Sequence, residues 1–295
     1  MKLIFRVIAL MALSASVHAQ SCCAVGSSCS ADVFLTSNRP LAGIRYSLKR
    51  FDLDQSALVT SENKSFFNPN QLETVELFGR YAIRGRHFFT LTIPYVILID
   101  RPRKTAATGI GDPVLFYQYQ LPWIKSKCNG WQQHLRLGLG LKFPIGKYNT
   151  ANDQGLQLGT GSFDILSAAN YFGQMGQWGL MLSINYKANT QNTAEVKLGD
   201  KLQALGDATF EWRKPAWRIL LMAGFGYEEI FMTRSHYKWK DYTGSKNVFA
   251  DAGLEFHAKH FAMSLKAQPS IYAIVNGTSF PKPIFTLESG WYYIF

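Results

Sequence analysis

Four cysteines are the most reactive side chains of the chain: Cys22, Cys23, Cys29 and Cys128. In an oxidising compartment thiols form disulfides, and four cysteines allow two bridges by three connectivities. A thiolate metal site is an alternative, although no clean Cys-x-x-Cys pair occurs. Free thiols and lipid attachment at Cys22 are two others, and the preceding Ala19-Gln-Ser21 is a poor lipidation motif. We take all four as disulfide candidates.

The chain offers few other residues for catalysis. His257 and His260 flank a predicted tight turn, where they could hold a metal ion. The segment from Gly140 to Lys147 superficially resembles a phosphate-binding loop, but it is one residue too long and no Ser or Thr follows Lys147. The sequence also lacks the His–Ser pairing near Ser-Asn-Gly that an outer-membrane phospholipase would need. We therefore predict no enzyme activity, no cofactor and no metal site.

Charged side chains form a third group, because many occur at alternating positions of predicted strands, on the face opposite the apolar residues. We expect them to point inward, either lining a wet pore or pairing with one another to fill the interior. The basic members are Arg45, Lys49, Arg80, Arg136, Lys142, Lys187 and Lys266. The acidic members are Glu76, Asp112, Asp164, Asp207, Glu211, Asp251, Glu255 and Glu288.

The elements that position these charges are predicted by alternation of apolar and polar residues. Between Gln177 and Lys187 every second residue is Trp, Leu, Ile or Tyr, and residues 134–143 repeat the pattern. Successive side chains of a strand point to opposite faces, and such a stripe has the length of a tilted transmembrane strand. We predict about twelve strands: 41–53, 72–84, 87–98, 112–122, 132–145, 162–172, 176–188, 202–212, 216–231, 247–257, 260–273 and 283–295.

The last of these strands resembles the closing strand of bacterial outer-membrane barrels. Its alternate residues include Trp291, Tyr293 and Phe295, and it ends on the aromatic Phe295. The resemblance implies that these residues form the signal read by the barrel assembly machinery.

The N-terminus predicts export. Lys2 and Arg6 flank an apolar run that ends in small residues, as in a Sec signal peptide cleaved after Ala19 or Gln20. We divide the chain into a signal peptide (1–20), a Cys-rich periplasmic tail (21–40) and a barrel (41–295). Removal of Lys2 and Arg6 from the 31 basic residues leaves 29 against 20 acidic ones, a net charge of +9. In an exported protein this charge favours lipopolysaccharide headgroups and excludes a nucleic-acid role.

The predicted connections alternate in length. Long polar links (54–71, 99–111, 146–161, 189–201, 232–246 and 274–282) alternate with tight turns, and only the link from Pro122 to Trp131 does not fit. Long extracellular loops and short periplasmic turns are typical of outer-membrane barrels. Six of the seven tryptophans lie at the predicted periplasmic ends, as expected of an interfacial girdle: Trp123, Trp131, Trp178, Trp212, Trp217 and Trp291. Cys128 lies on the same side as the tail, which predicts a disulfide between them.

Four short segments, three of them rich in glycine, carry a resemblance to a known family. They are Gly109-Ile-Gly-Asp112, Leu115-Phe-Tyr-Gln-Tyr-Gln-Leu121, Leu137-Gly-Leu-Gly-Leu-Lys-Phe-Pro-Ile-Gly146 and Leu158-Gly-Thr-Gly-Ser-Phe-Asp164. Residues 41–295 resemble the outer-membrane channel family of the phenol meta-degradation pathway, a relative of the long-chain fatty acid transporters. The resemblance implies passage of small hydrophobic or aromatic molecules. The Cys-rich tail lies outside the family pattern, and the transporters' N-terminal hatch motif is missing.

We therefore predict an all-β protein: a single, monomeric, antiparallel transmembrane barrel in the bacterial outer membrane, acting as a passive channel for small apolar or aromatic solutes. The alternative is a plugged barrel whose loops or Cys-rich tail dock a partner.

Asp112 and Asp164 either pin loops 99–111 and 146–161 into the channel mouth or cap turns. Four inward glycines, Gly138, Gly140, Gly224 and Gly226, either widen the lumen or, as we favour, allow strand curvature.

Overall fold

The computed structural model describes residues 39–52, 70–100, 105–122, 131–148, 157–235, 238–239, 243–276 and 282–295. Among these residues no helix has the length and apolar sequence that crossing a membrane requires. The predicted signal peptide, nearly all of the tail and the four cysteines lie outside the described residues.

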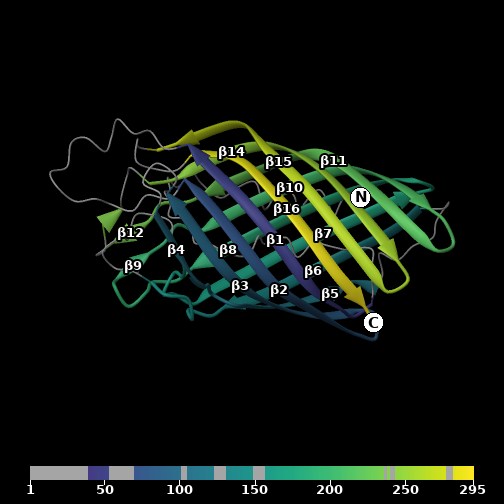
Figure 1. The fold of residues 1–295 in the computed structure, drawn as a ribbon, viewed down its shortest axis with the longest axis horizontal. Helices are drawn as coiled ribbons and strands as arrows, with labels where there is room; N and C mark the ends of the chain where they lie inside the picture. The colour runs from purple at the N-terminus through teal and green to yellow at the C-terminus, as the bar shows by residue number, and fades with distance from the viewer. Residues whose placement is uncertain are drawn as a thin grey trace, which may run out of the picture.

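Twelve long antiparallel strands form one closed sheet, because β1 pairs with both β2 and β16 while β2 also pairs with β3. The strands are tilted against the long axis of the molecule (Figure 1). Their bounds are β1 (Leu41–Asp52), β2 (Gln71–Ile83), β3 (His87–Asp100), β5 (Val114–Gln120), β6 (Trp131–Lys142), β7 (Asp164–Met175), β8 (Trp178–Asn189), β10 (Lys201–Arg213), β11 (Trp217–Ile230), β14 (Ser245–Ala258), β15 (Phe261–Val275) and β16 (Lys282–Ile294).

The predicted all-β barrel and its number of strands are confirmed. Most strand ends agree within a few residues, but one turn was misplaced. We predicted a turn at 173–175, whereas β7 continues to Met175 and the chain reverses at Gly176 and Gln177. Gly176 has a φ of +61°, a conformation that favours glycine, and Gly173 remains in the ladder opposite Leu180.

A second difference lies in the predicted link 99–111, which contains an additional short strand before the predicted strand 112–122. A short β4 (Thr105–Ile110) pairs with the outer half of β3, and β5 pairs with the inner half. The interruption at residues 111–113 contains Pro113, which has no N–H for the ladder, and Gly111 donates to the carbonyl of Pro94. Asp112 therefore sits at a break in the barrel wall.

Three further strands were predicted as loops. They are β9 (Val196–Lys197), β12 (Arg234–Ser235) and β13 (Lys238–Trp239), and they form a small sheet of their own. β9 lies on the link after β8, and β12 and β13 lie on the link after β11. The pairing of β12 with β9 therefore connects the two links, and β12 also pairs with β13. This sheet lies at the same end of the barrel as β4, opposite the C-terminal end of β16 (Figure 1). We call these the long-loop end and the short-turn end.

The outer face of the barrel is apolar. Leu, Ile and aromatic side chains are exposed at alternate positions of most strands, for example Leu180, Leu182 and Ile184 on β8. Trp178, Trp212 and Trp291 are exposed near the short-turn end, and the rings of Trp212 and Trp217 make an edge-on contact at 5.4 Å. This belt has the composition of a lipid-facing surface bordered by aromatic residues.

The inward glycines accommodate neighbouring side chains. A Cβ atom at Gly138 or Gly140 of β6 would overlap the ring of Phe116 on β5, and one at Gly226 would overlap the ring of Phe249. At Gly224 it would overlap the backbone of Gly206 and the carboxylate of Asp207. The space above all four is occupied, so these glycines do not widen the interior. We assign Gly138, Gly140 and Gly226 to close packing of aromatic rings, and Gly224 to the close approach of β10.

We expect Gly140→Ala to lower the free energy of unfolding by about 1–3 kcal/mol, because the added methyl group displaces Phe116. Urea unfolding in lipid vesicles, followed by tryptophan fluorescence, measures this change. Gly79→Ala is the matched control, since a Cβ atom there meets nothing within 4 Å. Equal stability of the two variants would contradict this account of the inward glycines.

Candidate functional site

The interior of the barrel carries the charges that alternation predicted to point inward. Lys49 and Lys266 are partly buried, and the others are almost fully buried: Arg45, Glu76, Arg80, Asp112, Arg136, Lys142, Asp164, Lys187, Asp207, Glu211, Asp251, Glu255 and Glu288. Burying a charge is costly unless it is paired and hydrogen-bonded. The partners of these groups therefore decide what the interior can do.

At the long-loop end Asp112, Lys142, Thr160 and Asp164 form what we call the outer-mouth network. The Lys142 ammonium lies 3.0 Å from Asp112 Oδ2 and also contacts Asp164 Oδ2 and Thr160 Oγ1. Asp112 and Asp164 are at most 2% exposed. One cation thus bridges two carboxylates that come from different strand ends.

Asp112 also fastens the link between β6 and β7. Its carboxylate accepts hydrogen bonds from the backbone N–H groups of Gly146 and Thr160, both at 2.8 Å, and from the Thr160 hydroxyl. Gly146 and Thr160 lie near opposite ends of that link, and the N–H of Gly159 donates to the carbonyl of Lys147. A single buried carboxylate therefore draws the two flanks of the 143–163 link together.

The contacts of Asp112 agree with loop pinning rather than turn capping. Asp164 does both, because it accepts from the hydroxyl of Ser162, two residues before it, and from the N–H of Thr190 on the next link. Asn192 donates to the carbonyl of Thr160 and adds a second connection between these two links. The long-loop end is thus held together by side chains that connect neighbouring links.

Deeper in the barrel, arginines pack against aromatic rings. Phe88 of β3 is fully buried, with the guanidinium of Arg136 4.2 Å and that of Arg80 5.7 Å from its ring centre. Arg45 lies over the ring of Phe78 and pairs with Glu76, with Nε 2.6 Å from Oε2. Cation–π contacts are strongest where water is excluded, so the rings stabilise buried cations.

The wall formed by β14 and β15 holds a further ion pair and a contact between a histidine and a carboxylate. Lys266 lies 2.8 Å from Asp251, and His257 lies 2.9 Å from Glu255. Glu288 is opposite Lys266 in the ladder between β15 and β16. His260, which we had paired with His257 as a possible metal ligand, instead stacks on Tyr293.

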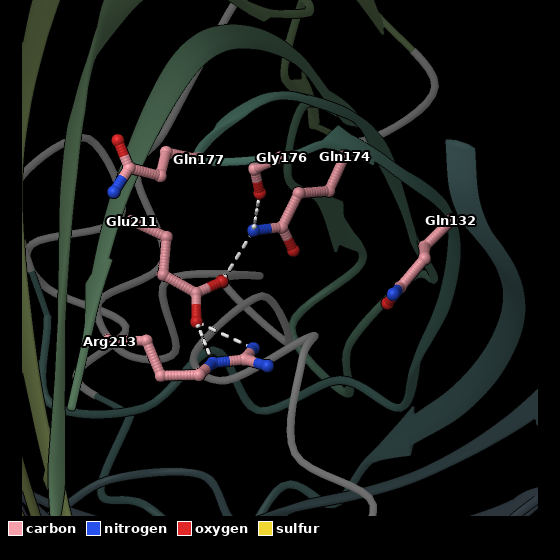
Figure 2. A pocket seen from close by; sticks show the side chains of 6 residues that line it. All are labelled: Gln132, Gln174, Gly176, Gln177, Glu211 and Arg213. Carbon is pink, nitrogen blue, oxygen red and sulfur yellow. Dashed lines mark hydrogen bonds and ion pairs between the residues drawn. The ribbon is translucent and has the colours of Figure 1, made fainter. Parts of the chain in front are cut away.

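A cavity of about 160 Å³ lies at the short-turn end, between the β7–β8 turn and β10. Figure 2 shows Glu211 between Arg213 and Gln174, which contact its two carboxylate oxygens at 2.6 Å each. The side chain of Gln132 lies across the cavity from this group (Figure 2). Glu211 thus fixes the β7–β8 turn to β10.

Sequence reasoning missed several residues of the site. Thr160 belongs to a segment quoted for the family resemblance, yet nothing in it indicates contact with Lys142 and Asp112. Phe88 and Phe116 were not among the residues predicted to face inward. The period of two along their strands is the signal that could have placed them there.

The comparisons with known proteins can now be set beside this geometry. Residues 37–271 match the family described as "Putative MetA-pathway of phenol degradation". This range covers most of the barrel. The chain belongs to this family. None of the curated proteins matches it.

Solved structures with a similar fold include an outer membrane channel from Pseudomonas putida F1. It is 14% identical, has a TM-score of 0.65, and the match covers 96% of this chain and 100% of that one. The β domain of the Bordetella autotransporter BrkA (12% identity, TM-score 0.43, 87% and 100% covered) and outer membrane phospholipase A of Escherichia coli (9%, 0.37, 86% and 96%) are less similar.

Family, fold and the apolar outer belt place the protein in the bacterial outer membrane. In such barrels the long loops face the cell exterior and the short turns face the periplasm. The long-loop end with the outer-mouth network is therefore extracellular, and the short-turn end is periplasmic.

We expect Asp112→Ala to release the flanks of the 143–163 link. The change removes charge-assisted hydrogen bonds that contribute about 1.5–3 kcal/mol each, so trypsin cleavage after the exposed Lys147 should become about tenfold faster or more. Peptide mapping of a proteolysis time course measures the rate.

Asp52→Ala is the control, because it removes one carboxylate of the same kind from an exposed position at the same end of the barrel. Cleavage at Lys147 that is unchanged in Asp112→Ala would show that the carboxylate does not hold the link.

Proposed function

We propose that this protein is a passive outer-membrane channel for small hydrophobic or aromatic molecules. The observation that carries the proposal is the composition of the inner wall, where aromatic rings alternate with paired charges. The buried rings on the strands are Phe78, Phe88, Phe116, Phe172, Phe249 and Tyr292. Rings that face inward give an apolar solute contacts which a purely polar lumen lacks.

Transport by this route needs no covalent step, no cofactor and no catalytic residue. The concentration gradient drives the flux, and the shape and charge of the interior select the solute. We accordingly infer that the protein is not an enzyme. The lumen-lining residues would be Arg45, Glu76, Arg80, Asp112, Arg136, Lys142, Asp164, Lys187, Asp251, Glu255, Lys266 and Glu288.

The outer-mouth network is the element that would control access. Its buried groups hold the flanks of the 143–163 link over the mouth, beside the break between β4 and β5. A solute entering from outside would have to pass this network, so opening requires that Asp112 release Gly146 or Thr160. Passage would then be gated at the extracellular end.

A plugged barrel that docks a partner is the second candidate. The pairing of interior charges favours it, since Arg45 with Glu76, Lys142 with Asp112 and Asp164, and Lys266 with Asp251 balance one another inside the wall. In that case the external loops or the Cys-rich tail would do the binding.

Other partners follow from position. Lipopolysaccharide would surround the basic loops. The exposed Trp291 and Tyr293 on β16, with the following Phe295, would be read by the barrel assembly machinery. We infer a monomer, because the closed sheet satisfies its own edges.

We expect vesicles with lipopolysaccharide in the outer leaflet to take up a small aromatic dye faster when they contain the protein. Asp112→Ala should raise the protein-dependent rate about tenfold, because the loss of one charge-assisted hydrogen bond shifts the opening equilibrium by that order. Stopped-flow fluorescence measures the rate.

Vesicles with Asp52→Ala and protein-free vesicles are the controls. A folded protein with no uptake above the protein-free rate, in either the original chain or Asp112→Ala, would reject the channel and favour the docking role.

A further inference from the structure

A second, larger cavity opens at the periplasmic mouth, with a volume of about 680 Å³. It lies between the β10–β11 turn and the β14–β15 turn, with the start of β1 and the end of β16 on its other side. Arg213, His257 and Ile294 lie on it. His257 and Ile294 are buried on the inner face of their strands, so the cavity belongs to the mouth of the barrel. We call it the periplasmic groove.

The groove is strongly basic. Five of its residues have basic side chains: Arg39, Arg213, Lys214, Arg218 and Lys259. Arg213 pairs with the buried Glu211, and His257 contacts the buried Glu255. Lys214 and Lys259 are exposed at the tips of two neighbouring turns. A concave surface with one sign of charge concentrates ions of the opposite sign.

The remaining lining is apolar. Pro215 and Ala216 come from the β10–β11 turn, while Trp217 and Ile294 come from the ends of β11 and β16. Trp217 is half-buried and is supported by the edge-on contact with Trp212. An apolar lining under a cationic rim suits a molecule with a flat apolar body and an anionic group.

We propose that the periplasmic groove binds aromatic carboxylates, with the carboxylate between Lys214 and Lys259 and the ring against Trp217. A carboxylic acid with an ordinary pKa near that of Asp or Glu is ionised at neutral pH. The volume lies within the range of small-molecule sites. The inference rests on the proposed function, since it names organic anions as solutes that the channel holds at its periplasmic exit.

The alternative source of an anionic group is a phospholipid of the inner leaflet. The groove reaches from the rim, where Trp217 alternates with the outward-facing side chains of β11, to the inner side of the mouth, where His257 and Ile294 are buried. A solute in the periplasm or in the lumen reaches that position directly, which favours the carboxylate over the headgroup.

The test is equilibrium binding of 4-fluorobenzoate to the refolded protein in a neutral maltoside detergent, followed by ¹⁹F NMR of the ligand. We expect saturable binding that weakens as NaCl is raised, because exposed ion pairs are screened. The neutral isostere 4-fluorobenzyl alcohol should bind about tenfold more weakly or not at all, since it lacks the attraction to two cations.

The double variant Lys214→Gln/Lys259→Gln should weaken 4-fluorobenzoate binding about tenfold. Arg84→Gln/Arg86→Gln is the matched control, because it removes two exposed cations at the same end of the barrel but from the β2–β3 turn, outside the groove. Equal weakening by both double variants would overturn the site. If the first double variant does not fold, Lys259→Gln alone is compared with Arg86→Gln.

Competition distinguishes the sources of the anion. Displacement by benzoate, but not by inorganic phosphate or a short-chain phosphatidylglycerol at the same concentration, supports the proposal. Stronger displacement by the phosphatidylglycerol would assign the groove to lipid, and displacement by phosphate as strong as by benzoate would show that the apolar lining plays no part. Either result overturns the proposal.

The binding assay tests the groove and the dye-uptake assay tests the channel, so either proposal can fail without the other. Dye uptake without 4-fluorobenzoate binding removes this site and leaves the channel. Binding without uptake leaves a carboxylate site on a barrel that does not conduct, so the proposed function fails alone.

Discussion

Closure of the sheet by the pairing of β1 with β16 is the constraint on which the rest of the structure depends. In the hydrocarbon core of a membrane an unpaired backbone N–H or C=O group costs several kcal/mol, and only a closed ladder leaves none at the edges. The pairing runs from Leu41 opposite Ile294 to Asp52 opposite Lys282, with one irregularity at Arg50 and Phe51. Closure divides every strand into a lipid-facing side and an interior side.

The interior side then has to accommodate polar groups away from bulk water. Ion pairs such as Arg45 with Glu76, and cation–π contacts such as Arg136 with Phe88, satisfy these groups inside the wall. Such pairs contribute little net stability, but removing one partner leaves an uncompensated charge. A path through the interior can therefore open only if each charged group that loses its partner gains another. The outer-mouth network is suited to this exchange, because Lys142 already contacts two carboxylates.

Alternation made much of the fold predictable. The stripe between Gln177 and Lys187 anticipated β8, and the same period placed Arg45 and Glu76 on the inner face, because in a closed barrel the period of two alone decides the side. Partners were not predictable in this way. Asp112 reaches Gly146 and Thr160, which lie 34 and 48 residues further along the chain, and only the closed structure brings them together.

The errors have physical reasons as well. At Gly138 and Gly140 the contact with Phe116 was not predictable, since a sequence does not show which ring fills the space above a glycine. The short β4 fell within the predicted link 99–111, because its pairing with the outer half of β3 creates the strand and has no signature in residues 105–110 themselves. In both places the deciding interaction is between neighbouring strands and has no signature within one of them.

The most direct test of gating at the extracellular end is single-channel conductance in a planar bilayer. The protein should show brief, infrequent openings, and Asp112→Ala should remain open for a much larger share of the time at the same open conductance. If the two proteins have the same open probability, the network around Asp112 does not control the channel. If neither conducts while both are folded, the barrel is closed to ions, and the dye-uptake assay decides whether it passes apolar solutes.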